Sequence, residues 1–378
     1  MLKRLCKTVP ILLIMGPTTI FSANTHKAEL KMLADRTRFE SLLLKVNAAP
    51  QGFRYRATKE RSMLHFGRPI TYRWDVHYLK SDSIFIQFTK PDSLRDTAIF
   101  FNDRIILSRG DKHISRMIRY RGVSRFLQES HFDSEISLLW ENYDIELSEG
   151  ESYIGRPVHG LQITPKYRGR PTISAKIDLQ TGLLLYFEKK RSTKTDTISQ
   201  VSQILHLEVG NDTQPPLSYQ FDRQDSLNQR SSTGESYRNI AAFVADNDQT
   251  ILVPKHVPAG FRVREVRRRS RRNHSFIHTL YGDGLSVISL FQGDSAGKSK
   301  SHKKKKRKHR RNVTAISGQK QQIHYSIVSS IPQEELELMA ASFVPVGQQH
   351  EKSTHWFLYL ACFVCAAAAL VLFNRRKK

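Results

Sequence analysis

Residues 153–190 read YIGRPVHGLQITPKYRGRPTISAKIDLQTGLLLYFEKK, and this stretch decides the fold. It contains three runs that read as strands, at 153–165, 171–179 and 183–190. Gln180-Thr181-Gly182 joins the last two as a tight hairpin, since glycine can adopt the positive φ that such turns use. The stretch therefore predicts neighbouring antiparallel strands, and further strands are expected on either side of it, at 143–149 and 196–208.

The residues before this stretch predict more strands and two helices. Strands separated by Pro, Gly, Asp and Asn are expected at 53–56, 70–78, 83–88, 97–101, 104–108 and 113–118. Apolar residues recur at helical spacing in 27–47, where Pro50 and Gly52 end the predicted helix. A second helix is predicted at 123–142.

The residues after this stretch predict a linker and a smaller domain. Residues 211–240 are polar and contain Pro215-Pro216, which is typical of a linker. Strands are expected at 261–266, 275–281, 285–292, 313–317 and 322–330. A closing helix is expected to begin at Pro332, with Glu334 and Glu335 in its first turn. The chain is therefore expected to be mainly β with few helices (α+β), with domains at 26–210 and 241–345.

Both ends of the chain carry membrane signals. Lys3, Arg4 and Lys7 precede a short apolar run, which predicts a signal peptide at 1–25. Residues 356–373 are eighteen residues without a charge, followed by four basic residues. This predicts a transmembrane helix at 355–373 and a cytoplasmic tail at 374–378, so the domains would be exported. The alternative, a buried core helix, is disfavoured by the basic residues behind the run.

The net charge of +25 is concentrated in short segments. Residues 262–272 carry seven Arg against one Glu, and residues 298–311 carry ten Lys and Arg and no acid. The globular body outside these segments is near neutral, and an exported chain does not meet nucleic acid, so no nucleic-acid partner is expected. The three cysteines lie at positions 6, 362 and 365, so the exported part has no thiol for a disulfide or metal site.

Several motifs resemble the MucB/RseB family. The segment 143–190, with Gly155-Arg156-Pro157 and the Thr181-Gly182-Leu183 turn, looks like the second half of the LolA-like domain found there. In the second domain, three further motifs are similar to that family in the same order. These motifs are Val257-Pro258-Ala259-Gly260-Phe261, Tyr281-Gly282-Asp283-Gly284-Leu285, and Ile327-Val328-Ser329-Ser330-Ile331-Pro332.

The resemblance implies a LolA-like antiparallel half-barrel at 26–210 and a smaller antiparallel β/α domain at 241–345. It implies a non-catalytic, periplasmic regulator of the envelope stress response. Such a protein binds the periplasmic part of an anti-sigma factor and responds to lipid or lipopolysaccharide. The chain would then lie on the periplasmic side of the inner membrane, with a cytoplasmic C-terminus. The alternative is a LolA-like lipid or lipoprotein carrier without a sigma-factor role.

No enzymatic constellation stands out, and no cofactor or metal is expected. The sequence contains no nucleophile elbow, phosphate loop, zincin helix or paired cysteines. His274 and His278 are four apart on a predicted strand, which is not the spacing of a helical ligand pair. An envelope enzyme is therefore the weakest of the three functional hypotheses.

Two sets of residues are candidates for ligand contact. An apolar pocket in the half-barrel is expected where aromatic and aliphatic residues are dense, although most of them would be core. An anionic surface or ligand is expected at the basic segments, where a solvated loop and an acidic protein partner are the alternatives. The pocket set is Phe85, Phe88, Phe100 and Ile105. The basic set is Arg267, Arg268, Arg269, Arg271, Arg272, Lys303, Lys304, Lys305, Lys306, Arg307, Lys308, Arg310 and Arg311.

Overall fold

The structure is a computed structural model of the 378-residue chain. It describes residues 18–65, 68–80, 83–101, 105–110, 136–192, 197–210, 223–226, 235–247, 249–271, 274–294 and 313–347. The predicted helix at 355–373, the strand at 113–118, most of the helix at 123–142 and the basic run at 298–311 lie outside these ranges. Within them, no helix is both long enough and apolar enough to cross a membrane.

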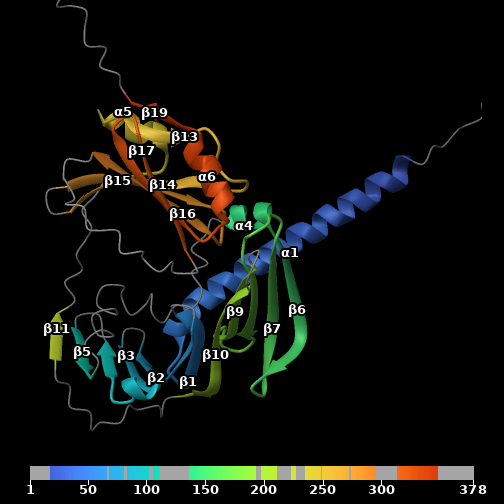
Figure 1. Ribbon diagram of the computed structural model, residues 1–378. Helices are drawn as coiled ribbons and strands as arrows, with labels where there is room; N and C mark the ends of the chain where they lie inside the picture. The colour runs from blue at the N-terminus through green and yellow to red at the C-terminus, as the bar shows by residue number, and fades with distance from the viewer. Residues whose placement is uncertain are drawn as a thin grey trace, which may run out of the picture.

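The larger sheet has eleven strands, all paired antiparallel, in the order β11-β5-β4-β3-β2-β1-β10-β9-β8-β7-β6 (Figure 1). Its two end strands do not pair with each other, so the sheet stays open. The strands are β1 (Tyr55–His65), β2 (Arg68–Lys80), β3 (Ser83–Lys90), β4 (Ala98–Phe101), β5 (Ile105–Arg109), β6 (Tyr143–Tyr153), β7 (Arg156–Pro165), β8 (Thr172–Asp178), β9 (Leu184–Ser192), β10 (Thr197–Val209) and β11 (Arg223–Ser226). A 3₁₀ turn, η1 (Asp92–Leu94), joins β3 and β4.

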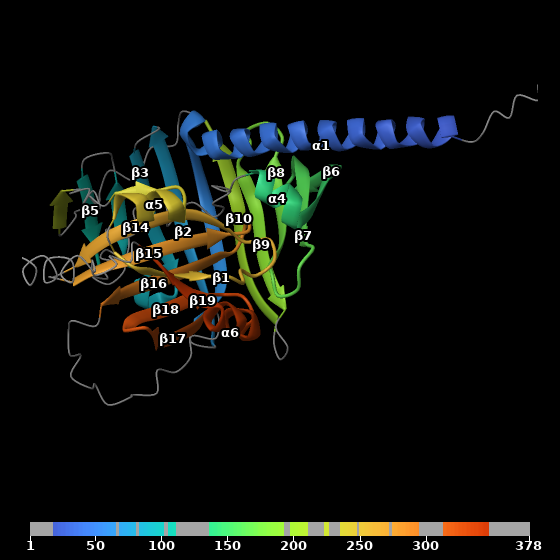
Figure 2. The ribbon, with the colours of Figure 1, turned by 90° about the horizontal axis from the view of Figure 1, so that it is seen from above.

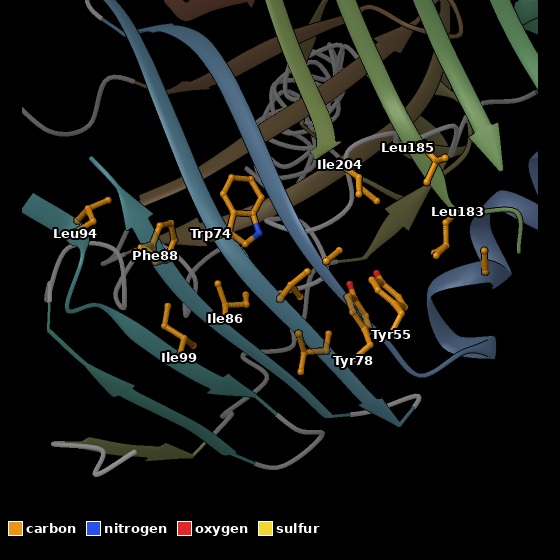
Figure 3. Close-up of a cluster of buried hydrophobic side chains, with 14 of the residues drawn as sticks. Tyr55, Trp74, Tyr78, Ile86, Phe88, Leu94, Ile99, Leu183, Leu185 and Ile204 are labelled. Carbon is orange, nitrogen blue, oxygen red and sulfur yellow. The ribbon is translucent and has the colours of Figure 1, made fainter. Parts of the chain in front are cut away.

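One face of this sheet packs against the long helix α1 (Thr18–Gly52). Phe39, Leu42, Leu43 and Val46 recur at helical spacing and pack on β7, β8 and β9. A second cluster on the same sheet holds Trp74 and is shown in Figure 3. Figures 1 and 2 both show the N-terminal part of α1 extending past the β6 edge of the sheet. The short helix α4 (Ile136–Asn142) leads directly into β6.

The smaller sheet has six antiparallel strands in the order β12-β14-β15-β16-β18-β17. They are β12 (Ser236–Tyr237), β14 (Arg262–Arg271), β15 (His274–Gly282), β16 (Val287–Asp294), β17 (Thr314–Lys320) and β18 (Ile323–Ser329). Helices α5 (Ile240–Asp246) and α6 (Gln333–Ala341) cover one face, together with the pair β13 (Ile251–Pro254) and β19 (Phe343–Val346).

The fold class predicted from the sequence is confirmed at the level of a mainly β chain with few helices and large antiparallel sheets. The predicted hairpin at Gln180-Thr181-Gly182 is also confirmed, with Gly182 at φ +76°. Two details differ. Two short strands, β11 and β12, lie within the range predicted as linker, because edge strands this short and polar leave no alternation to read. Pro332 is the residue before α6 and not its first residue.

Candidate functional site at the junction of the two sheets

The turn between β15 and β16 brings the smaller sheet onto the larger one. Asp283 lies in this turn, and its Oδ1 accepts hydrogen bonds from the backbone N–H groups of Leu285 at 2.9 Å and Ser286 at 2.6 Å. Gly284 has φ +108°, a conformation that residues with a Cβ rarely adopt. The turn therefore fixes the direction in which the Asp283 carboxyl points.

Arg170, in the loop between β7 and β8, forms the centre of the junction. Its Nε lies 3.1 Å from Oδ2 of Asp283, an ion pair without the alignment of a hydrogen bond. Its Nη1 and Nη2 donate to Glu335 of α6 at 3.2 and 2.8 Å. The Arg170 and Asp283 side chains are both 1% exposed. Charges this deeply buried are tolerated only when they are paired, so this contact fixes the two sheets relative to each other.

Three further residues of the larger domain complete the cluster around Asp283. The Tyr143 hydroxyl donates to Oδ2 of Asp283 at 3.0 Å, and Asn142 Nδ2 donates to the Asp283 carbonyl at 2.9 Å. Lys189 donates to the Leu285 carbonyl at 3.3 Å. Burial lowers the pKa of Lys189, while the Asp283 charge opposes that shift. Burial also raises the pKa of Asp283, and the N–H groups of Ser286 and Leu285 and the Arg170 charge oppose it.

The other motifs of the smaller domain meet at the same place. Gly260 has φ +81°, and its carbonyl accepts from Asn142 Nδ2 at 2.9 Å. Ala259 accepts from Arg170, whose guanidinium carbon lies 4.7 Å from the centre of the Phe261 ring. A Cβ on Gly169 would meet Cδ of Pro332 at 2.6 Å. All three motifs that carry the family resemblance in this domain thus contact one loop and one helix end of the larger domain.

A cleft opens beside this junction, with a volume of about 1410 Å³. Its floor is the face of β7, β8 and β9 that carries Ser174 and Lys190, and its wall is the start of α6 and of β17. The lining includes both Arg170 and Glu335 of the junction. The lining mixes polar and apolar surface and holds more basic than acidic side chains. The basic residues are Lys166, Arg168, Arg170, Lys190 and Arg191, and the acidic residues are Glu188, Glu334 and Glu335. A groove of this size and character suits a polar segment of another protein better than a small apolar ligand.

A second cavity, of about 640 Å³, lies between α1 and the strands β6 and β7. Leu33, Leu42 and Leu147 form its apolar part. Arg38 and His159 line it too, and both pair with Glu149 on β6. Burial lowers the pKa of His159, and the charges of Arg38 and Lys45 add to that effect.

The residues predicted to line an apolar pocket lie on both faces of the larger sheet. Phe88 packs within the core cluster beside Trp74, at 6.2 Å between ring centres. Phe85 pairs with Phe100 across β3 and β4 and lies on the opposite face of the sheet, beside His77. Ile105 begins β5. The three phenylalanines line neither cavity described above, so a pocket at this position stays a prediction.

The basic residues predicted to contact an anionic surface are only partly described. Arg267, Arg268 and Arg269 lie on β14, and Arg271 is its last residue. Arg272 and the run from Lys303 to Arg311 lie outside the described residues. Among the residues that the structure describes, no three His, Cys, Asp or Glu side chains lie close enough to hold a metal ion.

Sequence reasoning did not find Arg170, Tyr143, Lys189 or Glu335. Each comes from an element distant in the sequence from the Asp283 turn, and no local pattern links them. The sequence does contain one signal for this site, Gly282-Asp283-Gly284. An acidic residue between two glycines in a turn between strands can reach residues that are distant in the sequence.

Comparison with known proteins finds similarity at the level of structure. No family model matches the chain, and no curated protein matches it. A crystal structure of MucB in complex with MucA(peri) covers 81% of this chain and 98% of its own, at 16% identity and a TM-score of 0.47. A MucA/MucB complex of Pseudomonas aeruginosa gives the same values. A LolA superfamily protein from Nitrosomonas europaea covers 45% of this chain and 93% of its own, at 13% identity and a TM-score of 0.23. The resemblance predicted from the motifs is confirmed to this extent: the chain is similar to MucB over most of its length.

Proposed function

We propose that this chain is an extracytoplasmic regulatory protein of the envelope-stress type that binds the periplasmic part of an anti-sigma factor. The observation that carries this proposal is the convergence of three MucB/RseB-like motifs on one buried junction beside a large polar cleft. A junction built from residues of both domains presents one fixed surface, which is what a regulator needs to hold an extended partner. The protein acts by binding and not by catalysis.

The cleft is the proposed site for the partner. Its floor lies on β7 to β9 and its wall comes from the other domain, so a bound segment would contact both domains at once. The excess of basic residues in its lining favours a segment with acidic side chains. In the sequence, the basic run at 298–311 ends shortly before Thr314, which lines the cleft.

The proposed location is the periplasmic side of the inner membrane. The support is the uncharged run at 356–373 with four basic residues behind it, and the short apolar run near the N-terminus. A tether of this kind keeps the domains close to the membrane in which an anti-sigma factor is anchored, so the two proteins would meet at high effective concentration.

Lipid binding is the second candidate, as part of the regulation or as the sole function of a LolA-like half-barrel carrier. The observation that favours it is the cavity under α1, which is mainly apolar and has basic residues at its rim. An acyl chain with an anionic head group fits that combination.

Binding between the purified full chain and the purified periplasmic segment of each anti-sigma factor encoded in the same genome tests the proposal. We expect a saturable complex that Lys190→Glu weakens at least tenfold. Lys176→Gln is the control, because Lys176 lies on neighbouring β8 and pairs with Glu151 outside the cleft. No complex with any of these segments would contradict the anti-sigma role. Equal weakening by both variants would contradict the cleft as the site.

A further inference from the structure

The face of the smaller sheet that α5 and α6 leave uncovered carries a second cluster of charged and aromatic residues. On β14 and β15, Arg267 pairs with His278, and Arg269 pairs with Phe276. Paired residues of antiparallel strands share a face, so these four side chains lie together. Val266 and Ile277 point the other way and belong to the buried core. None of the four lines either cavity.

Two nitrogen atoms in this cluster are buried and have no hydrogen-bond partner among the residues that the structure describes. Nε of Arg269 and Nε2 of His278 are inaccessible to solvent and form no hydrogen bond within the described part of the chain. An unsatisfied buried polar group costs about 1–3 kcal/mol, so natural structures rarely leave two side by side. Diagonal neighbours on adjacent strands lie within reach of long side chains, which places the Arg269 guanidinium beside the imidazole.

Aromatic rings hold the imidazole in place. The ring of His278 stacks on Phe291 of β16, with 4.4 Å between centres and an interplanar angle of 8°. Phe276 packs against the same Phe291 at 6.2 Å. These rings exclude water from one side of the cluster, so a charge on Arg269 or on a bound ligand is felt more strongly there than at an open surface.

The local charge is positive. Glu265 is an acid on this face, and it is already engaged by Ser236 and Arg267. Burial lowers the pKa of His278 to about 4, and the charges of Arg269 and Arg267 add to that shift while Glu265 opposes it. At neutral pH the imidazole is therefore uncharged and can donate one N–H, while Arg269 supplies the charge.

We propose that Arg269 and His278, with Arg267 beside them, form a binding site for a phosphate group. A phosphate presents several oxygens in different directions. Once side chains rotate to uncover the two buried nitrogen atoms, it can accept from Nε of Arg269, from Nε2 of His278 and from the Arg267 guanidinium together. A carboxylate is flat and is satisfied by a single guanidinium fork, so it would leave the imidazole without a partner. A free phosphate and a phosphate carried by a lipid head group present the same oxyanion to this site.

The site stands apart from the partner proposed for the cleft, because it shares no residue with that lining. Where the phosphate belongs to a lipid, the inference rests on the proposed lipid response and names residues for it. Loss of partner binding would leave the phosphate site untouched, and loss of phosphate binding would leave the cleft untouched, so failure of the two can be told apart.

Calorimetric titration of the full chain with inorganic phosphate at constant ionic strength tests the site. We expect saturable binding that Arg269→Gln weakens at least tenfold. Arg269→Lys keeps the charge but removes the Nε donor, and it is expected to weaken binding severalfold. Arg268→Gln is the matched control: it removes the same charge one residue away, on the opposite face of β14, where Arg268 donates to Ser275. It is expected to change the affinity less than twofold.

The results that overturn the proposal are specific. Equal losses in Arg269→Gln and Arg268→Gln would mean diffuse attraction to the arginines and no site. Absence of phosphate binding in the wild type would also overturn it, as would Arg269-dependent binding of a glutamate-rich peptide in place of phosphate. Vesicles containing phosphatidic acid identify the source. Binding that depends on Arg269 assigns the site to a lipid head group, and binding of inorganic phosphate alone assigns it to a soluble phosphate.

Discussion

Replacing Arg170 by Met tests whether the junction holds the two domains together. The change keeps a long apolar stem beside Phe261 but removes the partner of two carboxylates and a donor to the Ala259 carbonyl. Removing one member of a buried ion pair costs about 3–5 kcal/mol, because the other charge is left buried.

The structure favours the lower end of that range. After the change, Asp283 keeps the hydroxyl of Tyr143 and two backbone N–H groups, with Lys189 nearby. Glu335 is 29% exposed and can be hydrated again. We therefore expect a loss of about 3 kcal/mol, which is roughly a hundredfold in the equilibrium between joined and separated domains.

Calorimetric unfolding of the full chain measures this effect. The wild type is expected to unfold with its two domains coupled, and Arg170→Met is expected to separate the transition into two. Arg156→Met is the matched control, because Arg156 pairs with Asp178 inside the larger domain at 2.9 and 3.0 Å. It should lower the stability of that domain without separating the transitions.

A double variant sharpens the test. Asp283→Asn removes the charge that Arg170→Met leaves unpaired, so the two changes together should cost less than the sum of their separate costs. Additive costs, or a single unchanged transition in Arg170→Met, would refute the reasoning that this ion pair couples the domains.

The remaining predictions concern other parts of the chain. Gly260→Ala should destabilise the chain more than Gly150→Ala. Both glycines have a positive φ, but of the two only Gly260 would place its new Cβ against a neighbour, Cγ of Asn142 at 2.8 Å. Chemical denaturation measures the difference in the free energy of unfolding. The pKa of His278 in the folded chain is about 4, below the 6.5 of the free side chain. The contribution of His278 to the free energy of unfolding is therefore complete above pH 6.5 and is lost as the pH falls toward 4. That part of the pH dependence should disappear in His278→Gln, as denaturation curves between pH 4 and 7 will report. Protease added to spheroplasts should digest residues 26–354 and spare the C-terminal tail, and a protected body would contradict the topology. A fluorescent fatty acid should bind the wild type more tightly than Leu33→Glu, and equal binding would exclude the cavity under α1 as its site.

The secondary structure could be predicted because its signals are local. The amphipathic spacing of Phe39, Leu43 and Val46 predicts one helix, and that face of α1 is buried on the sheet. The hairpin turn at Gly182 could be read for the same reason. The strands β11 and β12 could not, since each is defined by its pairing with β5 or β14 and not by its own residues.

The junction could not be predicted, because its members are far apart in the sequence. Arg170 lies 165 residues from Glu335 and Tyr143 lies 140 from Asp283. Nothing near Arg170 distinguishes it from the exposed Arg168 two residues earlier. The family motifs drew attention to the segments around Gly260 and Asp283. Only the three-dimensional structure shows that both segments contact the larger domain at the same junction.

Arg170 and Glu335 belong to the junction and also line the cleft, and this overlap links partner binding to domain coupling. A segment bound in the cleft must contact the residues that set the orientation of the two domains. If it binds the joined state tenfold more tightly than the separated state, it stabilises the joined state by about 1.4 kcal/mol, and joining the domains strengthens its binding by the same factor. A variant that loosens the junction should therefore lower the affinity for the proposed partner, even though the floor of the cleft is unchanged. Tight binding to Arg170→Met would show that the partner uses one domain alone.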